Sequence, residues 1–277
     1  MKKIIAFLSL FMIVLANPKG NLFIVGGGNI SQELLSNFVD LAGGKDARIV
    51  IIPIASEEPL EAGKSRLEKF KQLGCTNVKV VIFDRNNADS DSITAYFDGV
   101  KGVFFGGGDQ NKITNALLGT KLLGKIFQIY ENGGVIGGTS AGAAIMSKIM
   151  LTGNELVCKD TVNSFSTIMK RNVEVKEGLG FVNEFIVDQH FVKRKRHNRL
   201  LSVLLDNPDK PCVGIDEATA VIYHGGKIKV VGESNVIIYK IKDKKSIKVN
   251  KNNIYSAKDI EMQLLVEGDE YSFRGKK

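Results

Sequence analysis

Short apolar runs alternate with helical patterns along the first half of the chain, and this alternation constrains the fold more than any other feature. The runs expected to form strands lie at 22–25, 47–54, 78–83, 102–105 and 135–136. The segments expected to form helices lie at 31–41, 58–73 and 111–130, with a further helix after Ser140. This order is typical of a mostly parallel sheet with helices on both faces. The sequence therefore predicts an α/β fold of three layers (α/β/α), with the sheet in the middle.

Clusters of glycine follow several of the apolar runs, at 26–28, 106–108 and 137–138. Glycine lets the backbone turn sharply or approach a ligand closely. Parallel sheets bind their ligands beyond the carboxyl ends of the strands. We therefore expect the functional site at this edge of the sheet.

The pattern changes from Val221 onward, where short β-type runs are joined by basic hairpins. The runs expected to form strands lie at 221–223, 228–231, 236–241 and 262–266. We interpret them as an antiparallel extension of the same domain, because no low-complexity linker precedes them. The length of 277 residues and the hydrophobic content of 44% fit one large domain, placed at 17–277.

The formal net charge of +8 is compatible with a nucleic-acid or anionic-surface partner. The basic residues are scattered, however, and many of them lie between 227 and 251. They do not alternate with aromatic residues in the pattern that stacks nucleic-acid bases. The sequence therefore does not predict a nucleic-acid partner.

The N-terminal segment has the pattern of a signal peptide. Lys2 and Lys3 precede an apolar stretch at 4–15, and small residues stand at the cleavage positions around Ala16. The stretch is too short for a stable membrane anchor. The alternative is a buried first strand. We expect residues 1–16 to be removed on export, to the periplasm or the extracellular space.

The three cysteines, Cys75, Cys158 and Cys212, form no zinc-binding spacing, and their odd number argues against a disulfide framework. We interpret them as small buried apolar residues. The glycine run at 106–108 lacks the lysine of a P-loop and does not fit G-x-G-x-x-G. The sequence therefore predicts neither a metal nor another cofactor.

Ser140 lies in Gly138-Thr139-Ser140-Ala141-Gly142, which fits the G-x-S-x-G nucleophile elbow. An apolar run precedes this motif and a small-residue helix follows it, as the elbow requires. There the serine hydroxyl is exposed at a strained turn, and the Ala141 N–H can stabilise an oxyanion. The alternative is a serine that only caps the following helix.

A serine nucleophile needs a base, and the chain has three histidines. His190 follows an apolar run and precedes a basic helix, so we expect it at the same edge as the glycine clusters. The alternative is a strand-end histidine bonded to a backbone carbonyl. His197 is expected inside the helix and solvated, and His224 stands beside a glycine hairpin.

An acid must orient the histidine. Asp216 and Glu217 end another apolar run, and only one of them can face the site because side chains alternate along a strand. The sequence leaves the choice between them open. The order serine, histidine, acid differs from that of common α/β-hydrolases.

Charged side chains surround His190 in the sequence. Arg194, Arg196 and Arg199 follow it, and the last two share a helix face if the helix includes them. Arginines of this kind bind carboxylates, and Asp188 is suited to a cationic group. The alternative is a solvated basic helix. A backbone N–H of the run at 106–110 is suited to a second oxyanion donor.

At these residues the chain resembles the cyanophycinases. The matching stretches are 106–110 (GGGDQ), 137–143 (GGTSAGA), 188–191 (DQHF) with Arg194, Arg196 and Arg199, and 214–220 (GIDEATA). The likeness extends from about residue 20 into the C-terminal strands. The Asp-Gln-His-Phe run at 188–191 with its spaced arginines is the most specific part, and it separates the chain from the related aspartyl dipeptidases.

The resemblance implies a fold like that of class I glutamine amidotransferases and a serine-type exopeptidase. Such enzymes release β-Asp-Arg dipeptides from cyanophycin, a polyaspartate with arginine on each side-chain carboxyl. The resemblance also implies a homodimer without a metal. It assigns Ser140 as nucleophile, His190 as base and Glu217 as acid, with oxyanion N–H groups from Gly108 and Ala141. The substrate-binding positions that it implies are Gln110, Asp188, Gln189, Arg194, Arg196 and Arg199.

Two alternatives to cyanophycin hydrolysis remain at this point. One is a peptidase for other aspartyl or isoaspartyl peptides. The other is an inactive polymer-binding protein on the same fold, which the full set of catalytic side chain types makes less favoured.

Overall fold

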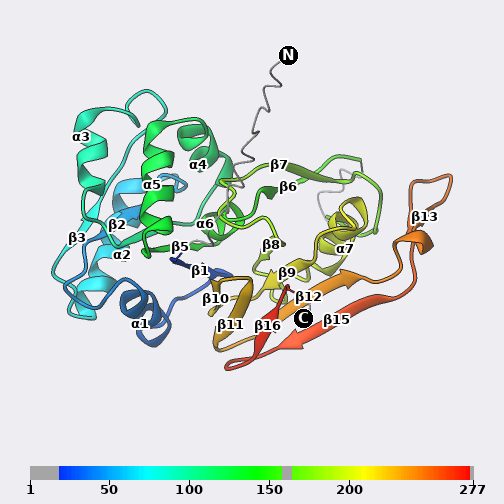
Figure 1. Ribbon diagram of the computed structural model, residues 1–277. Helices are drawn as coiled ribbons and strands as arrows, with labels where there is room; N and C mark the ends of the chain where they lie inside the picture. The colour runs from blue at the N-terminus through cyan, green and yellow to red at the C-terminus, as the bar shows by residue number, and fades with distance from the viewer. Residues whose placement is uncertain (1–18, 158–163, 275–277) are drawn as a thin grey trace, which may run out of the picture.

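A sheet of eight strands forms the centre of the computed structural model, which describes residues 19–157 and 164–274 (Figure 1). Its parallel part has the order β1, β5, β4, β2, β3. The bounds are Asn21–Val25 (β1), Ile49–Ile52 (β2), Val78–Val80 (β3), Gly102–Phe105 (β4) and Val135–Thr139 (β5). The predicted α/β class with a mostly parallel sheet is confirmed. The predicted signal segment, residues 1–16, lies outside the described residues.

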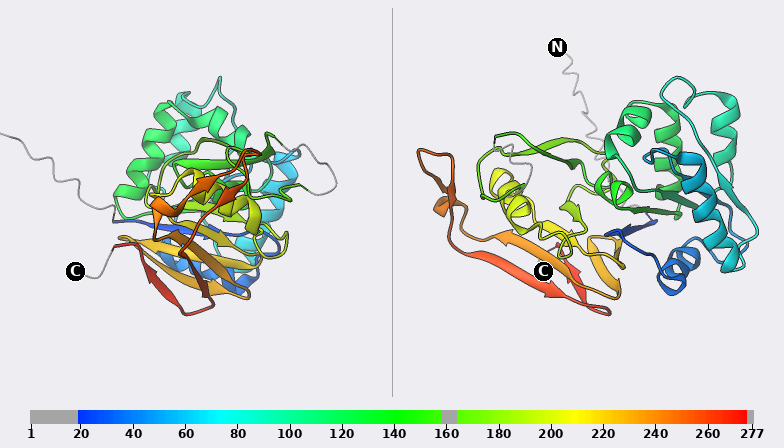
Figure 2. Two further views of the ribbon diagram at one scale, coloured as in Figure 1. Left: turned by 90° about the vertical axis from the view of Figure 1, so that its right-hand side faces the viewer. Right: turned by 180° about the vertical axis from the view of Figure 1, so that it is seen from behind.

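Helices cover both faces of this sheet (Figures 1 and 2). The helices of one face are α1 (Gln32–Leu41) and α2 (Pro59–Gln72), and those of the other face are α4 (Gln110–Leu117) and α5 (Lys121–Glu131). A short segment, α3 (Asp91–Thr94) with η1 (Ala95–Phe97), lies beyond β3. Successive side chains of β1 point to opposite faces of the sheet. Phe23 packs with Phe38 of α1 on one face, and Ile24 belongs to the cluster around α4 and α5 on the other.

The helix expected at 111–130 is divided into α4 and α5. Gly119 adopts φ +76°, a conformation that interrupts a helix and favours glycine. Thr120 then caps α5, because its hydroxyl accepts a hydrogen bond from the Leu123 N–H at 3.1 Å. Ser31 starts α1 in the same way, by accepting from Leu34 N–H at 3.1 Å.

The predicted helix after Ser140 is present and short. It is α6 (Ala141–Ala144), and the chain then forms β6 (Ile149–Glu155), which pairs with β7 (Val173–Glu177). The carbonyl oxygens of Ile145 and Met146 accept hydrogen bonds from Leu179 and Val182 instead of continuing a helix. The tertiary partner therefore ends α6 after one turn.

A second sheet of four strands has the order β15, β12, β9, β8. Its bounds are Ile186–Gln189 (β8), Cys212–Ile215 (β9), Val236–Ile241 (β12) and Ile260–Leu265 (β15). The helix α7 (His197–Asp206) packs on it through a cluster that includes Leu200 and Val203. His190 therefore comes from a different sheet than Ser140, which corrects the expectation of one shared sheet edge.

The C-terminal strands are antiparallel, as predicted, but they divide between the two sheets. The strands β10 (Thr219–His224), β11 (Lys227–Gly232) and β16 (Glu270–Ser272) extend the eight-stranded sheet beyond β1, whereas β12 and β15 belong to the second sheet. Because β9 and β10 are consecutive in the chain, their connection carries Asp216 and Glu217 from one sheet to the other.

The cysteines were expected to be small buried residues, and no segment after the N-terminal one was expected to span a membrane. Cys75 and Cys212 are buried free thiols, and Cys158 lies outside the described residues. Within 19–157 and 164–274, no helix combines the length and the apolar character that crossing a membrane requires.

Candidate active site

Ser140 stands at the turn between β5 and α6, with φ at +53° and ψ at −109°. A non-glycine residue rarely adopts a positive φ, so this backbone is strained. The two motif glycines make the turn possible. A Cβ on Gly138 would lie 2.2 Å from the Gly142 carbonyl oxygen, and a Cβ on Gly142 would lie 2.5 Å from that of Phe105. The turn leaves the Ser140 side chain partly exposed.

The structure brings His190 to this serine. Its Nε2 lies 2.9 Å from Ser140 Oγ. His190 follows β8 and also has a positive φ, of +47°. Its backbone N–H donates to the Gly26 carbonyl at 2.7 Å. This hydrogen bond joins the end of β8 to the end of β1, and therefore joins the two sheets at the site.

Glu217, and not Asp216, contacts the histidine. Glu217 Oε1 lies 2.6 Å from His190 Nδ1. The Asp216 carboxylate accepts hydrogen bonds from Lys193 N–H and from the Ser234 hydroxyl, each at 2.8 Å. The two neighbouring carboxylates thus point to different partners, and the structure answers the question that the sequence left open.

The surroundings favour a neutral His190. Burial is the main cause that lowers its pKa below the ordinary value. The hydrogen bond to Glu217 raises the pKa, and the nearby charges of Arg194 and Arg196 lower it further. The net direction is downward, so the ring can accept a proton at neutral pH.

Gly27 and Gly28 provide the space for these side chains. A Cβ on Gly27 would lie 2.3 Å from His190 Cε1, and a Cβ on Gly28 would lie 2.8 Å from Glu217 Cβ. The sequence placed this glycine cluster at the expected edge, but it gave no sign that the cluster accommodates the histidine and the acid. The Gly27 carbonyl also accepts from Ala218 N–H at 3.0 Å, next to Glu217.

Of the two predicted oxyanion donors, Ala141 directly follows Ser140, and Gly108 follows Gly107, which lies against the serine. Ala141 is the first residue of α6, so its N–H has no partner within that helix. Gly107 lies directly against the serine, since a Cβ on it would be 3.3 Å from Ser140 Cβ. Gly108 follows with φ +134°, and a Cβ there would be 2.0 Å from the Ala55 carbonyl oxygen. Only glycine fits this approach.

Asp188 of β8, two residues before His190, forms a buried ion pair with Arg199 of α7. Arg199 Nε donates to Asp188 Oδ2 at 2.8 Å, and Nη2 donates to Oδ1. The two side chains are only 1% and 4% exposed. Their charges therefore neutralise each other, and neither is open to a substrate charge. Direct contact of either group with substrate stays a prediction and requires the pair to separate.

Arg196 holds Gln189, the residue before the histidine. Its Nη1 donates to the Gln189 carbonyl at 2.7 Å and to Gln189 Oε1 at 2.9 Å. Burial lowers the pKa of Arg196 to about 10, so the side chain remains charged at neutral pH. Arg196 precedes α7 and Arg199 lies within it, so the two do not share a helix face as expected.

Arg194 and Gln110, two further predicted substrate-binding residues, differ in their exposure to solvent. The Arg194 side chain is exposed, and its charge acts on His190. Gln110 is buried at the start of α4, and its Nε2 donates to the carbonyls of Leu151 and Thr152 at 2.8 and 2.7 Å. Gln110 therefore ties α4 to β6, whereas Arg194 is open to an anionic group.

His197 is not the solvated helix residue that we expected. It begins α7, and its Nδ1 lies 2.8 Å from the Tyr239 hydroxyl. Its ring packs edge-on against Phe191 at a centroid distance of 4.8 Å. His224 stands at the β10–β11 hairpin, with its Nδ1 2.9 Å from the Gly20 carbonyl oxygen. Neither histidine contacts Ser140 in this structure.

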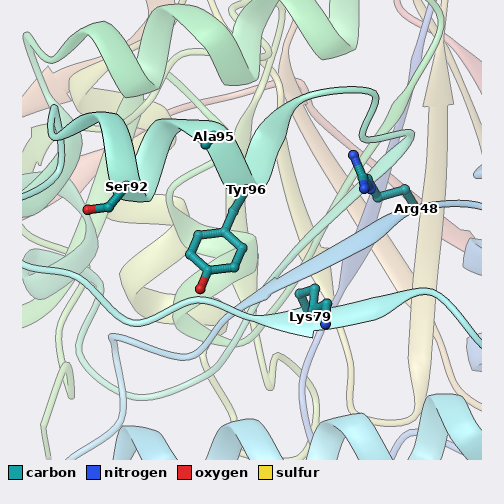
Figure 3. Close-up of a pocket in the computed structure, with 5 residues that line it drawn as sticks. All are labelled: Arg48, Lys79, Ser92, Ala95 and Tyr96. Atoms are coloured by element: carbon teal, nitrogen blue, oxygen red, sulfur yellow. The ribbon is translucent and has the colours of Figure 1, made fainter.

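A cavity of about 260 Å³ lies elsewhere, between β3 and the α3 segment (Figure 3). Its lining residues are Arg48, Lys79, Ser92, Ala95 and Tyr96. Two hydroxyl groups are present there, but no histidine or carboxylate that could activate them. Among the described residues, no group of three or more His, Cys, Asp or Glu side chains is arranged to hold a metal ion.

Comparison with known proteins identifies the family. The model of peptidase family S51 matches residues 22–231, more than half of the chain. The chain belongs to peptidase family S51. This protein is therefore a serine-type peptidase, which agrees with the prediction of a serine hydrolase.

Curated relatives of this S51 peptidase are cyanophycinases. One from Synechococcus elongatus is 32% identical over 265 residues, covering 92% of this chain and 80% of the relative. One from Geminocystis herdmanii is 32% identical over 266 residues, covering 92% and 94%. One from Trichormus variabilis is 34% identical over 226 residues, covering 79% and 73%. The predicted resemblance to cyanophycinases is confirmed.

Two solved structures share the fold. A peptidase from an acI-B1 Actinobacterium superposes with a TM-score of 0.67 at 24% identity, covering 91% of this chain and 96% of that one. A putative peptidase E from Listeria monocytogenes has a TM-score of 0.51 at 19% identity, with coverages of 78% and 99%. These similarities agree with the predicted class I glutamine amidotransferase-like fold.

Proposed function

We propose that this S51 peptidase hydrolyses cyanophycin to β-Asp-Arg dipeptides, with Ser140 as nucleophile, His190 as general base and Glu217 as orienting acid. The observation that supports this most is the hydrogen-bonded chain of the three side chains. Ser140 Oγ, at 2.9 Å, and Glu217 Oε1, at 2.6 Å, contact the two different nitrogens of His190. The identity to cyanophycinases over most of the chain supports the substrate.

The proposed reaction has two halves. Ser140 Oγ attacks the scissile carbonyl carbon while its proton passes to His190 Nε2. The oxyanion accepts hydrogen bonds from Ala141 N–H and Gly108 N–H. His190 then gives the proton to the leaving nitrogen as the C–N bond breaks, which leaves an acyl-enzyme. Water attacks the ester by the same route, its proton passes through His190 back to Ser140, and the acid product leaves.

Glu217 stabilises this cycle in two ways. Its contact with Nδ1 fixes the tautomer in which Nε2 carries no proton and can accept one. It also stabilises the imidazolium that forms after the transfer. The low pKa of His190, caused mainly by burial, keeps the ring neutral before the attack.

The substrate carries a free carboxylate and a guanidinium in each dipeptide unit. We propose that the exposed Arg194 receives a carboxylate beside the nucleophile. Gln189, held by Arg196, and Gln110, held against β6, shape the adjoining surface. Asp188 and Arg199 support this surface from beneath as a closed pair.

The direct test measures release of β-Asp-Arg from insoluble cyanophycin. We expect release by the wild type and a loss of about 10⁶-fold in kcat for Ser140→Ala, the order seen when a nucleophile of this kind is removed. Short Asp-X and isoaspartyl peptides serve as the comparison. A wild type that cleaves only these peptides contradicts cyanophycin as substrate, and a folded wild type that resists a fluorophosphonate probe and cleaves nothing contradicts the triad as well.

We further propose that the chain is exported after removal of residues 1–16, and that it forms a homodimer. The basic and apolar N-terminal pattern supports export, and the cyanophycinase resemblance supports the dimer. Amino-terminal sequencing of secreted protein is the test of export, and an intact Met1 contradicts it. Light scattering tests the dimer, which requires twice the mass of the single chain.

A further inference from the structure

The C-terminal strands contain a segment of unusual charge, residues 240–258, which we call the lysine arm. Its seven lysines are Lys240, Lys242, Lys244, Lys245, Lys248, Lys251 and Lys258, and its one acidic residue is Asp243. The arm alone therefore carries +6 of the chain's formal net charge of +8. The other 258 residues are close to neutral, so the positive charge of this protein is a local property.

The lysine arm projects from the molecule. It continues β12 and β15 beyond α7 and ends in the small hairpin of β13 (Lys248–Val249) and β14 (Tyr255–Ser256) (Figures 1 and 2). All seven lysines are exposed. Among the described residues, ion pairs occupy two of them, Lys242 with Glu261 at 3.3 Å and Lys244 with Asp209. Most of the positive charge thus faces solvent.

The arm is also fixed in place. The Tyr255 hydroxyl donates to Asp206 of α7 at 2.7 Å, and the Tyr255 N–H donates to the Ile168 carbonyl at 3.1 Å. The Lys170 N–H donates to the Asn253 carbonyl at 2.9 Å. A surface that is held in advance loses less entropy when it binds a partner. These bonds therefore favour a docking element over a solvated loop.

Two apolar side chains accompany the lysines at the hairpin. Val249 is 38% exposed and Ile254 is 36% exposed. Exposed apolar side chains beside lysines suit the boundary between headgroups and acyl chains, where burial and charge attraction add. They contribute little to binding a soluble polyanion.

The chemistry of the lysine arm argues against nucleic acid and against the proposed polymer substrate as its partner. Tyr255 is its one aromatic residue and its hydroxyl is bonded to Asp206, so the arm offers no platform for stacking bases. The proposed polymer substrate carries a guanidinium for every free carboxylate, so it presents no net charge to attract lysines. Lysine is a hydrated point charge that suits an array of phosphates.

We propose that the lysine arm docks this protein on a bilayer rich in acidic phospholipids, with its lysines at the headgroup phosphates and with Val249 and Ile254 at the interface. Each lysine near such a surface strengthens binding about fivefold, and added salt screens the attraction. The inference does not depend on the peptidase activity, so the two can fail separately.

The test is cosedimentation of the full chain with vesicles of phosphatidylcholine, with and without phosphatidylglycerol. We expect binding only to the acidic vesicles, with loss at high salt. Neutralising Lys245, Lys248 and Lys251 to alanine should weaken binding about 100-fold. The matched control neutralises Lys79, Lys101 and Lys121, which are equally exposed on the other part of the molecule, and should bind nearly as the wild type does.

Several results overturn the proposal. One is that the wild type does not bind acidic vesicles, and another is that the arm and control variants lose vesicle binding equally. A third is tighter binding to a DNA duplex than to the vesicles. Retention of polymer by the arm in the absence of any vesicle binding also overturns it. The Val249→Ser/Ile254→Ser variant should weaken vesicle binding several-fold while leaving its salt dependence intact, and an unchanged affinity contradicts the interfacial role. Unfolding midpoints of all variants exclude misfolding.

Discussion

The two sheets contribute to the site in different ways. The eight-stranded sheet provides Ser140, at φ +53°, and glycines such as Gly27 and Gly108, where an added Cβ would lie 2.3 and 2.0 Å from a neighbouring atom. The four-stranded sheet provides His190 at the end of β8, two residues after Asp188, which is paired with Arg199. One half of the site is therefore positioned by steric exclusion and the other half by charge pairing and hydrogen bonds.

The two halves should therefore respond differently to mutation. Steric positioning fails when an atom is added, because a tightly packed turn has no space to give. Charge pairing fails when one partner is removed, because the other is left buried and unpaired. The two halves meet where the His190 backbone N–H donates a hydrogen bond to the Gly26 carbonyl.

Among the variants that test this comparison, Glu217→Gln should give the largest effect. We expect kcat/KM to fall about 1,000- to 10,000-fold, because the histidine loses the partner that fixes its tautomer. Glu217 raises the pKa of His190, so its removal should move the acid limb of the pH profile to lower pH. The control is Asp216→Asn, whose carboxylate does not contact the ring, and its acid limb should stay in place. A limb that moves to higher pH in Glu217→Gln contradicts the assignment.

Asp188→Asn tests the charged half. It leaves the Arg199 guanidinium buried without its partner, and we expect unfolding free energy to fall by about 3–5 kcal/mol. Chemical denaturation measures this. Asp188→Asn/Arg199→Met removes the buried Arg199 charge as well, while Arg196, whose Nη1 lies 3.8 Å from Asp188 Oδ1, keeps its hydrogen bonds to Gln189. The double variant should therefore be more stable than the single one. A double variant that is less stable would show that packing, and not charge, dominates here.

Gly27→Ala tests the steric half. The added Cβ would meet the His190 ring at 2.3 Å, so the base should be displaced and kcat should fall about 100-fold. Gly43→Ala is the matched control, because Gly43 has a similar φ of +103° but nothing lies within 4 Å of its Cβ. Both variants should lose stability through backbone strain. Equal losses of activity in the two would argue against the contact with His190.

Ser234→Ala should have the smallest effect. Ser234 Oγ donates to Asp216 at 2.8 Å, and Asp216 keeps its second bond to Lys193 N–H. We expect a loss of about 1 kcal/mol in unfolding free energy and a reduction of a few-fold in kcat/KM, through a looser 190–196 turn. Ser36→Ala, which removes an exposed hydroxyl from α1, is the comparison and should change neither.

Much of the fold was predictable because its signals are local. Apolar periodicity located β1, β4, α1 and α2 close to their observed bounds, since pattern and capping are properties of neighbouring residues. The ends of α4 and α6 were harder to predict from the sequence. Gly119 and Thr120 indicate a break once it is known, whereas the end of α6 depends on residues 178–182, which are distant in sequence.

The residue types of the site and the turn that presents the serine follow from the local sequence. G-x-S-x-G is a local motif, and its two glycines are required by contacts within the same turn and the adjacent strand. Three features depend on how distant segments pack. Glu217 and not Asp216 contacts His190, Asp188 pairs with Arg199, and Gly27 leaves space for the His190 ring. The physical reason is that a charge finds its partner, and an atom its neighbours, through packing between segments that are far apart in the chain.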